Sequence, residues 1–219
     1  MAWSRLSLVV VWILALAGAL PAPAAVETVL VPTDDAFVRD KARQRDTNFD
    51  QDADEILVTA EGFPQGVPVD IGTLRFDLSG LSGTFASAEL RLYNQATPGP
   101  SVEVSVYSAV DDDWNGAGAG LGDETTITFN LAPAEGSLLD AQPGASDPAW
   151  MVFEGAALTS YVGAQLAGDE MVTFRVKVTS TGFVDVNVFE DRENGGGTGN
   201  APRLVLVPYA IYLPLVIQE

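Results

Sequence analysis

The stretch IGTLRFDLSGL, residues 71–81, and the stretch SAELRLY, residues 87–93, determine the fold that we predict. In the first, Leu74, Phe76 and Leu78 alternate with polar residues, so they would share one face of an extended strand. The second repeats this pattern, and the glycine-containing segment between them can reverse the chain. We therefore expect the two strands to pair as a hairpin. Each apolar row needs a second sheet to cover it, which predicts a β-sandwich.

Other short apolar segments, separated by turn residues, continue this pattern along the chain. We expect strands at residues 26–31, 36–38, 55–59, 102–107, 125–130, 150–153, 172–178, 184–188 and 204–207, the first two at sheet edges. Residues 156–166 differ, because Leu158, Tyr161, Val162 and Leu166 follow helical spacing. The predicted fold class is all-β, an antiparallel, jelly-roll-like β-sandwich with one short helix.

The first residues have the layout of a secretory leader. Arg5 precedes an apolar run over residues 6–20, and Ala22-Pro23-Ala24 supplies the small residues of a cleavage site. The run is shorter than the span of about 20 apolar residues that a membrane anchor needs. We expect a signal peptide at residues 1–24, a secreted product without a membrane span, and one domain at residues 26–208.

Composition excludes several classes of function. The 219 residues include 30 acidic and 11 basic side chains, a formal net charge of −19, and removing the leader takes away one base and no acid. Such a surface repels nucleic acid, whose binding depends on Lys and Arg. The chain has no cysteine, so an exported product would be stabilised without disulfides. It has no histidine, which excludes Ser-His-Asp, Cys-His and histidine–zinc chemistry.

A set of motifs occurs along nearly the whole mature sequence. They are DAFVRD (35–40), TNF (47–49), LRFDLS (74–79), AELRLY (88–93), Trp114, TITFN (126–130), Trp150 with LTSYV (158–162), and Glu190 with PRLV (202–205). In this order they resemble the DNRLRE-type domain, carbohydrate-binding module family 96. The resemblance implies an exported β-sandwich that binds polysaccharide and is not itself an enzyme. The alternative is a structural or adhesive cell-surface protein that shares the fold.

Residues 39–45 contain four of the 11 basic residues, Arg39, Lys41, Arg43 and Arg45. Their spacing at every second residue would project all four from one side of an extended segment. Guanidinium groups there could bind the carboxylates or sulfates of an acidic polysaccharide, and Arg192 would join them. The alternative is a solvated loop whose bases neutralise nearby acids, Asp40, Asp46 and Asp50.

Two acidic segments could indicate a calcium-binding site. They alternate over residues 50–54, as in calcium-binding loops, and Glu61 lies where the twelfth ligand would. Glu55, however, occupies the position that needs glycine, and a predicted strand follows, so we exclude an EF-hand. A looser calcium site built from these acids or from Asp111-Asp112-Asp113 stays open beside simple acidic solubility.

Two tryptophans differ in their surroundings. Trp114 lies in an acidic, glycine-rich loop and is the better candidate to stack on sugar rings, whereas Trp150 begins a strand and is expected in the core. In so acidic a chain, carboxylate pairs would arise by chance, so glycoside hydrolysis is not predicted. Residues 209–219 form a short apolar tail interrupted by Pro214, either a final strand or a docking or sorting tail.

Overall fold

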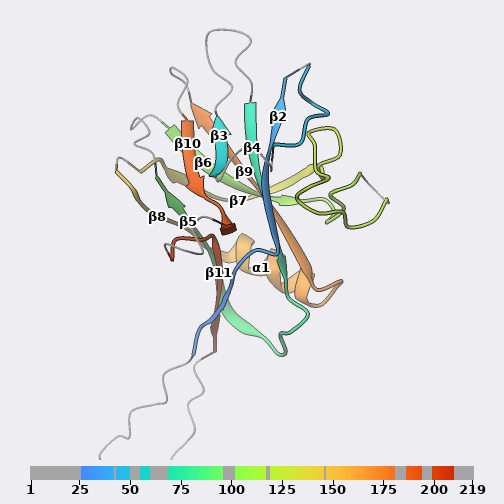
Figure 1. Cartoon of the computed structure of the whole chain (residues 1–219). Helices are drawn as coiled ribbons and strands as arrows, with labels where there is room; N and C mark the ends of the chain where they lie inside the picture. Colours follow the sequence, from blue (N-terminus) through green and yellow to red (C-terminus); the bar gives the residue numbers. More distant parts are fainter. Residues whose placement is uncertain are drawn as a thin grey trace, which may run out of the picture.

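The computed structural model has two antiparallel β-sheets packed face to face, with one helix beside them (Figure 1). It describes residues 26–41, 43–49, 55–59, 69–95, 102–116, 119–145, 147–180, 186–193 and 199–209. The expected signal peptide, and the tail after Tyr209, lie outside the described residues. Within the described ranges, no helix is long and apolar enough to span a membrane. The prediction of an all-β antiparallel sandwich with one short helix is confirmed.

Eleven described strands form the two sheets, and all their pairings are antiparallel. Sheet A has the order β1-β11-β5-β10-β3, with β8 also paired to β5: β1 (Thr28–Leu30), β3 (Glu55–Thr59), β5 (Phe85–Asn94), β8 (Ala149–Phe153), β10 (Val186–Glu190) and β11 (Arg203–Pro208). Sheet B has the order β2-β4-β9-β6-β7: β2 (Asp34–Asp40), β4 (Val69–Asp77), β6 (Val102–Ala109), β7 (Glu135–Pro143) and β9 (Met171–Ser180). As expected, β1 and β2 lie at sheet edges.

The expected hairpin between β4 and β5 does not form. β4 pairs with β2 and β9 in sheet B, whereas β5 pairs with β11, β8 and β10 in sheet A. The connecting turn, with Gly83 at φ 94°, carries the chain from one sheet to the other. Leu74 and Phe76 of β4 and Leu90 and Leu92 of β5 therefore enter one buried cluster from opposite sheets. Alternation correctly predicts which side chains of each strand face the core, but it does not specify which strand is the neighbour.

Gly72 of β4 allows the two sheets to approach closely. A Cβ atom at this position would lie 2.8 Å from Ile56 Cγ2 and 3.3 Å from Val58 Cγ2, both on β3 of the opposite sheet. These side chains are buried. The first distance is shorter than real Cβ contacts, so any larger residue at position 72 would push β3 away from β4.

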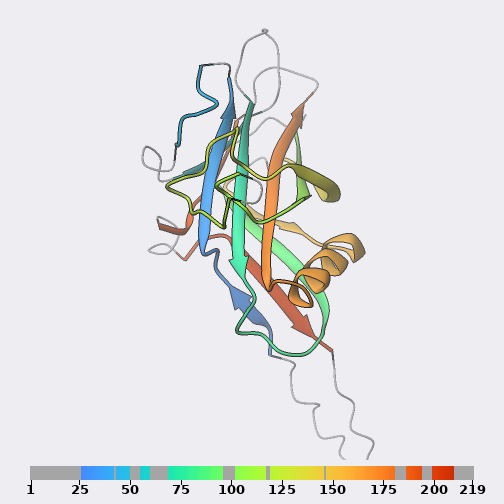
Figure 2. The same ribbon diagram turned by 90° about the vertical axis from the view of Figure 1, so that its right-hand side faces the viewer.

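The helix α1 (Ala156–Leu166) has the predicted bounds, and it contacts β5, β7 and β9, so it touches both sheets. Leu158 and Val162 are its buried residues. Tyr161 fixes it to sheet B, because its hydroxyl donates to the carbonyl oxygen of Thr173 at 2.8 Å and accepts the N–H of Ala109 at 3.3 Å. Figure 2 shows α1 beside the strands of sheet B.

One predicted strand is absent, and one observed strand was not predicted. Residues 125–130 form turns, in which the N–H groups of Thr126 and Ile127 donate to the carbonyl oxygen of Asp123 at 3.1 and 3.2 Å. Conversely, β7 was not predicted. Its sequence, EGSLLDAQP, is largely polar and exposed because it forms the edge of sheet B, so it has no apolar alternation to detect.

A second, smaller apolar cluster covers the outer face of sheet B. Ala36 and Val38 of β2 and Ile71 of β4 pack against Trp114 and Ile127. The last two belong to the long connection between β6 and β7, which crosses in front of β2, β4 and β9 in Figure 2. β4 is therefore buried on both faces rather than half-buried.

Trp114 is 0% exposed, so the expectation that it stacks on sugar rings is wrong. Its Nε1–H donates to Thr173 Oγ1 at 3.4 Å, and the guanidinium of Arg75 lies 4.9 Å from its ring centroid. The loop composition suggested exposure, but a large apolar ring above sheet B is buried by the cluster that it completes.

Replacing Trp114 with alanine should lower the free energy of unfolding by about 3–5 kcal/mol, the usual cost of truncating a buried tryptophan. Replacing Trp150, which is partly exposed, should cost roughly half of that or less, because little buried apolar area is lost. Denaturant unfolding of both variants and the parent measures the difference. A greater loss in the Trp150→Ala protein would contradict these positions.

Candidate functional site

The described part of the basic segment 39–45 turns instead of extending. β2 ends at Asp40, after which the N–H of Gln44 donates to the carbonyl oxygen of Lys41 at 2.6 Å, and the N–H of Thr47 to that of Gln44 at 3.1 Å. The alternation of side chains ends with the strand. The prediction that four cations project from one side is therefore wrong, and they differ in their surroundings.

Arg39 forms a bidentate ion pair inside the protein. Its Nε and Nη2 donate to the two carboxylate oxygens of Asp70 at 2.5 and 3.0 Å, and Asp70 is buried. Its guanidinium also lies 4.7 Å from the ring centroid of Phe49. This pair joins β2 to β4. It uses the guanidinium donors of Arg39 that were expected to bind a ligand.

The other three cations of the segment are exposed. Arg45 donates from Nε to Asp40 Oδ1 at 2.6 Å and lies 5.2 Å from the ring centroid of Phe129. This ion pair agrees with the alternative interpretation, in which the bases of a solvated loop neutralise nearby acids. An exposed pair of this kind adds little stability. Lys41 and Arg43 form no ion pair within the described residues. They are the cations of this segment that face solvent.

Arg192 lies in a separate polar network. It donates from Nη2 to Glu124 Oε1 at 2.7 Å, from Nε to Glu193 Oε1 at 2.6 Å, and from Nη1 to the carbonyl oxygen of Thr33. No contact among the described residues joins it to Lys41 or Arg43. The guanidinium of Arg192 is therefore hydrogen-bonded to other groups of the chain and does not join the basic segment.

Within the described ranges, no group of three or more acidic side chains could hold a metal ion. Asp111, Asp112 and Asp113 are included in that statement, and Asp111 Oδ1 instead accepts the N–H of Asp113 at 3.3 Å. Residues 50–54 lie outside the described ranges. The calcium hypothesis has no support at residues 111–113 and stays a prediction for the acidic segment.

Asp35 is a buried carboxyl, 2% exposed, at the start of β2. Its Oδ2 accepts the backbone N–H of Arg192 at 2.9 Å. Burial raises the pKa of this carboxyl well above its ordinary range, and the carboxylates of Glu193 and Asp191 raise it further, whereas the N–H and the charge of Arg192 lower it. At pH values between the ordinary carboxyl range and this raised pKa, the folded protein therefore retains a proton that the unfolded chain releases.

The outward side of sheet A carries a surface with aromatic and basic side chains. Tyr93 of β5 and Trp150 of β8 are opposite one another in register, with ring centroids 5.4 Å apart at 70°. Arg203 of β11 extends to Trp150, where its Cζ lies 4.9 Å from the ring centroid. All three side chains are partly exposed. We call this group, together with Arg91 and Glu89, the platform.

Arg91 and Glu89 extend the platform along β5. Arg91 donates from Nε and Nη2 to Glu89 Oε2 at 2.9 and 2.6 Å, and its side chain is 31% exposed. They lie on the opposite side of the strand from the buried Leu90 and Leu92. Guanidinium groups donate to hydroxyl or carboxylate oxygens, and aromatic faces contact the C–H groups of a sugar ring. The platform thus combines two kinds of contact on a rigid sheet.

The sequence identified only part of this surface. Alternation over residues 87–93 places Arg91 and Tyr93 on the polar side of a strand. The pairing of β5 with β8, which brings Trp150 to Tyr93, is a long-range contact that alternation does not predict. The expectation that Trp150 lies in the core is wrong. Alternation in β8 was the available signal, since Met151 and Phe153 are buried whereas Trp150 and Val152 are not.

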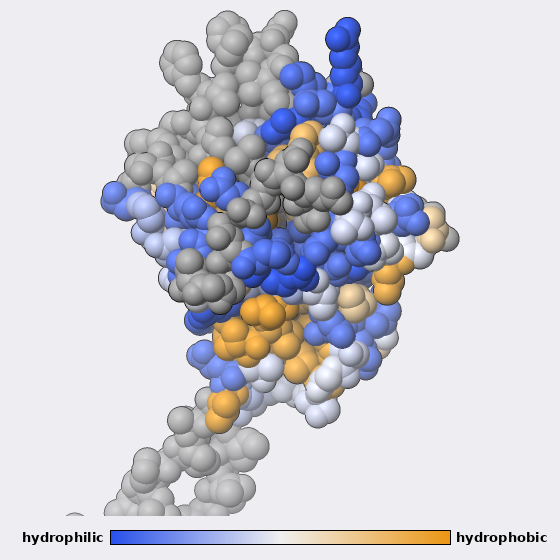
Figure 3. Space-filling view, viewed as in Figure 1, coloured by the Kyte–Doolittle hydropathy of each residue, from blue (hydrophilic) through white to orange (hydrophobic). Residues whose placement is uncertain are grey.

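A different surface lies near β1. Figure 3 shows a largely hydrophilic face with an apolar area in its lower half, over the part of the molecule where β1 and β11 lie in Figure 1. Val29 and Val31 are 50% and 55% exposed at this end of sheet A. Valine side chains offer no hydrogen bond to a hydroxyl-rich ligand, so we do not include them in the candidate site.

Comparisons with known proteins found a family model, a curated relative and a solved structure that are similar to this chain. The model of carbohydrate-binding module family 96 matches residues 26–207. A gellan lyase from Bacillus sp is 30% identical in an alignment of 195 residues that covers 86% of this chain and 7% of that protein, so the chain spans a small part of this relative. The CBM22-1 and GH10 modules of Clostridium thermocellum endo-1,4-beta-D-xylanase 10B, complexed with xylohexaose, align with a TM-score of 0.35 and 9% identity, covering 87% of this chain and 30% of that one.

Replacing Asp35 with asparagine should raise the melting temperature at neutral pH and flatten its dependence on pH. In the parent, the raised pKa means that stability falls as pH rises from the ordinary carboxyl range of about 4 towards the folded pKa. Asparagine has no charge to bury and can still accept the N–H of Arg192. Thermal melts of parent and variant across this range measure the effect.

The matched control is the neighbouring Asp34→Asn, which should destabilise at all these pH values because Asp34 pairs with the buried Arg75. If the Asp35→Asn protein instead melts below the parent at neutral pH, the environment of Asp35 favours its ionised form.

Proposed function

The chain belongs to carbohydrate-binding module family 96, and on this premise we propose that it is a secreted, non-catalytic protein that binds an extracellular or cell-wall polysaccharide. The leader pattern of residues 1–24 supports secretion. The absence of histidine, and the lack of any carboxylate pair singled out by its spacing, supports a role in binding rather than catalysis. The family match over residues 26–207 supports the class of ligand.

The platform is the observation that carries this proposal. Trp150 and Tyr93 provide aromatic surface, and Arg203 and Arg91 place guanidinium groups beside it. Tryptophan, tyrosine and arginine are also the residues that most often dominate the binding energy of protein–protein interfaces. Because they lie on paired strands, their positions are set before a ligand arrives, which lowers the entropic cost of binding.

We infer that the ligand is acidic. A net charge of −19 repels polyanions from most of the surface, so an acidic chain can approach only where cations gather. The platform has two arginines and one carboxylate, Glu89, which pairs with Arg91, so it keeps a net positive charge. The exposed Lys41 and Arg43 offer a second cationic position. Gellan is the first polysaccharide to test, because the relative from Bacillus sp is named gellan lyase.

The double variant Arg91→Ala, Arg203→Ala should bind its best acidic polysaccharide at least about tenfold more weakly, since a hydrogen bond to a charged group contributes about 1.5–3 kcal/mol. Trp150→Ala should also weaken binding through loss of aromatic contact. Raising the salt concentration should reduce the affinity of the parent, because exposed charges are screened over about 10 Å at 0.1 M. Titration calorimetry, after selection of the ligand on a glycan panel that includes gellan, measures each effect.

The matched control is Lys41→Ala, Arg43→Ala, which removes the same charge from the basic segment. A smaller loss in this control places the main contact on the platform, whereas a larger loss places it on the segment that the sequence predicted. Melting temperatures establish that each variant is folded. If no glycan binds the parent while the protein stays attached to cell surfaces, the structural or adhesive alternative replaces this proposal.

A further inference from the structure

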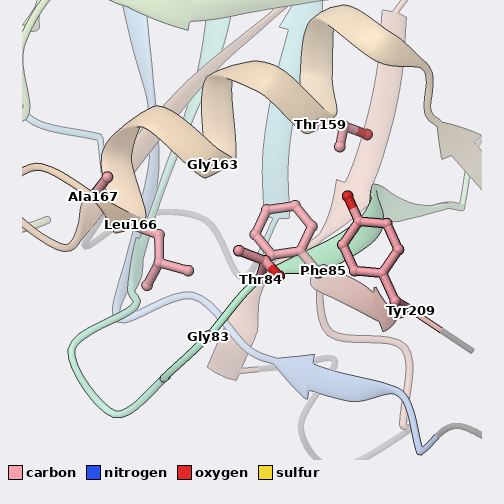
Figure 4. A pocket seen from close by; sticks show the side chains of 8 residues that line it. All are labelled: Gly83, Thr84, Phe85, Thr159, Gly163, Leu166, Ala167 and Tyr209. Atoms are coloured by element: carbon pink, nitrogen blue, oxygen red, sulfur yellow. The ribbon is translucent and has the colours of Figure 1, made fainter. Parts of the chain in front are cut away.

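A pocket of about 270 Å³ lies between α1 and the start of β5, apart from the platform residues (Figure 4). Its lining comes from three parts of the chain: Thr84 and Phe85 at the start of β5, Thr159, Gly163 and Leu166 of α1, and Tyr209 after β11. Figure 4 shows the rings of Phe85 and Tyr209 below the helix, where both line the pocket. An aromatic wall beneath a helix thus borders an open space.

Tyr209 is 59% exposed, so one edge of this wall faces solvent. Phe85 is half-buried and packs against the main core, which fixes the inner edge. Thr159 Oγ1 accepts the N–H of Ala88 at 3.2 Å, so its hydroxyl retains a proton to donate. The pocket therefore offers aromatic surface together with the hydroxyls of Thr84, Thr159 and Tyr209.

Gly163 opens the helix side of the pocket. It lies in the interior of α1, where glycine is less favourable than every other residue except proline. Packing does not require it, because an added Cβ would meet only Phe85 Cζ, at an ordinary distance of 3.9 Å, and its φ is not positive. The glycine therefore weakens the helix without relieving a clash, and the space it leaves belongs to the pocket.

Among the described residues, no charged side chain lines this pocket, although the chain has 41 acidic and basic residues. A charged ligand would lose hydration here without gaining a partner, so the lining favours a neutral one. The volume of about 270 Å³ lies just below the range of about 300–1,000 Å³ for pockets that hold drug-sized molecules, which suits a smaller ligand. Aromatic faces suit the C–H side of a sugar ring, and hydroxyls suit its rim.

We propose that this pocket is a second carbohydrate subsite, which holds one neutral pyranose unit between Phe85, Tyr209 and Gly163. The choice of a sugar rests on the proposed function, whereas the neutral character and the size of the ligand come from the lining. The subsite differs from the platform in charge, so the two recognise different units of a polysaccharide.

Amide-resolved NMR titration of the isotope-labelled parent tests the subsite, with the methyl glycosides of glucose, galactose, mannose and xylose at millimolar concentrations as probes. At least one should shift the amides of Gly83, Gly163 and Ala167 without shifting Arg91 or Tyr93. Added salt should leave this binding unchanged. Oligogalacturonate is the acidic probe for the platform, and it should show the opposite pattern.

Two variants examine the pocket itself. Gly163→Leu fills the space and Tyr209→Ala removes the exposed wall, and each should weaken the neutral glycoside at least tenfold while leaving oligogalacturonate binding unchanged. Gly163→Ala should raise the melting temperature and weaken binding less, which separates filling from unfolding. The platform variant Arg91→Ala, Arg203→Ala should bind the neutral glycoside like the parent.

Some results overturn the subsite. They are the absence of pocket shifts with all four glycosides, equal binding by the parent and both pocket variants, or glycoside shifts confined to the platform. In each of these cases, retained binding of oligogalacturonate to the platform leaves the proposed function standing. Conversely, pocket shifts without any binding of an acidic chain would remove the acidic proposal and leave the subsite.

Discussion

The buried guanidinium of Arg75 holds together the outer layer of sheet B. All five of its N–H donors are used: Nε and Nη2 donate to Asp34 Oδ2 at 3.0 and 2.7 Å, and the other bonds go to the carbonyl oxygens of Asp112, Leu121 and Gly122. A buried cation without its partners costs several kcal/mol, roughly 3–5 when one partner of a pair is removed. The connection between β6 and β7 therefore has to lie over β4, where its carbonyl groups reach this cation.

This constraint determines which surface can bind a ligand. With the connection fixed above β4, Trp114 and Ile127 complete an apolar cluster, and the outer side of β2 and β4 is closed. The outward side of sheet A has no such cover over the described residues of the platform, so Tyr93, Trp150 and Arg203 stay partly exposed. Arginine thus has two roles in this fold. On sheet B, groups of the chain bond every N–H donor of the buried Arg75, whereas on sheet A the guanidinium groups are partly exposed and are not saturated by chain carbonyl groups.

Local pattern predicted what depends on local physics. Alternation of apolar and polar residues identified β4, β5 and β9, and helical spacing identified α1 with its bounds, because in each element the side chains that face the main core are apolar and recur with a regular period. The pairing of β4 and β5 was wrong because sheet membership is decided by long-range contacts that leave no period. The predicted exposure of Trp114 and the predicted burial of Trp150 were wrong for a related reason. Trp114 is buried by a connection whose course depends on Arg75. Trp150 is partly exposed because β8 lies in sheet A with this side of the strand facing outward. The sequence shows that four cations lie within residues 39–45, but it does not show that Arg39 forms an ion pair with Asp70 and so cannot bind a ligand with the same groups.

β5 connects the proposed sites. It begins at Phe85, which lines the neutral pocket, and near its end carries Arg91 and Tyr93 of the platform. A strand rises about 3.3 Å per residue, so the eight steps from Phe85 to Tyr93 span roughly 26 Å. Hydrogen bonds to β11 and β8 on the two sides keep this length fixed. A monosaccharide can occupy only one of the two positions. A polysaccharide that reaches both would bind the second at a high effective concentration once the first is filled, which increases avidity without any new contact.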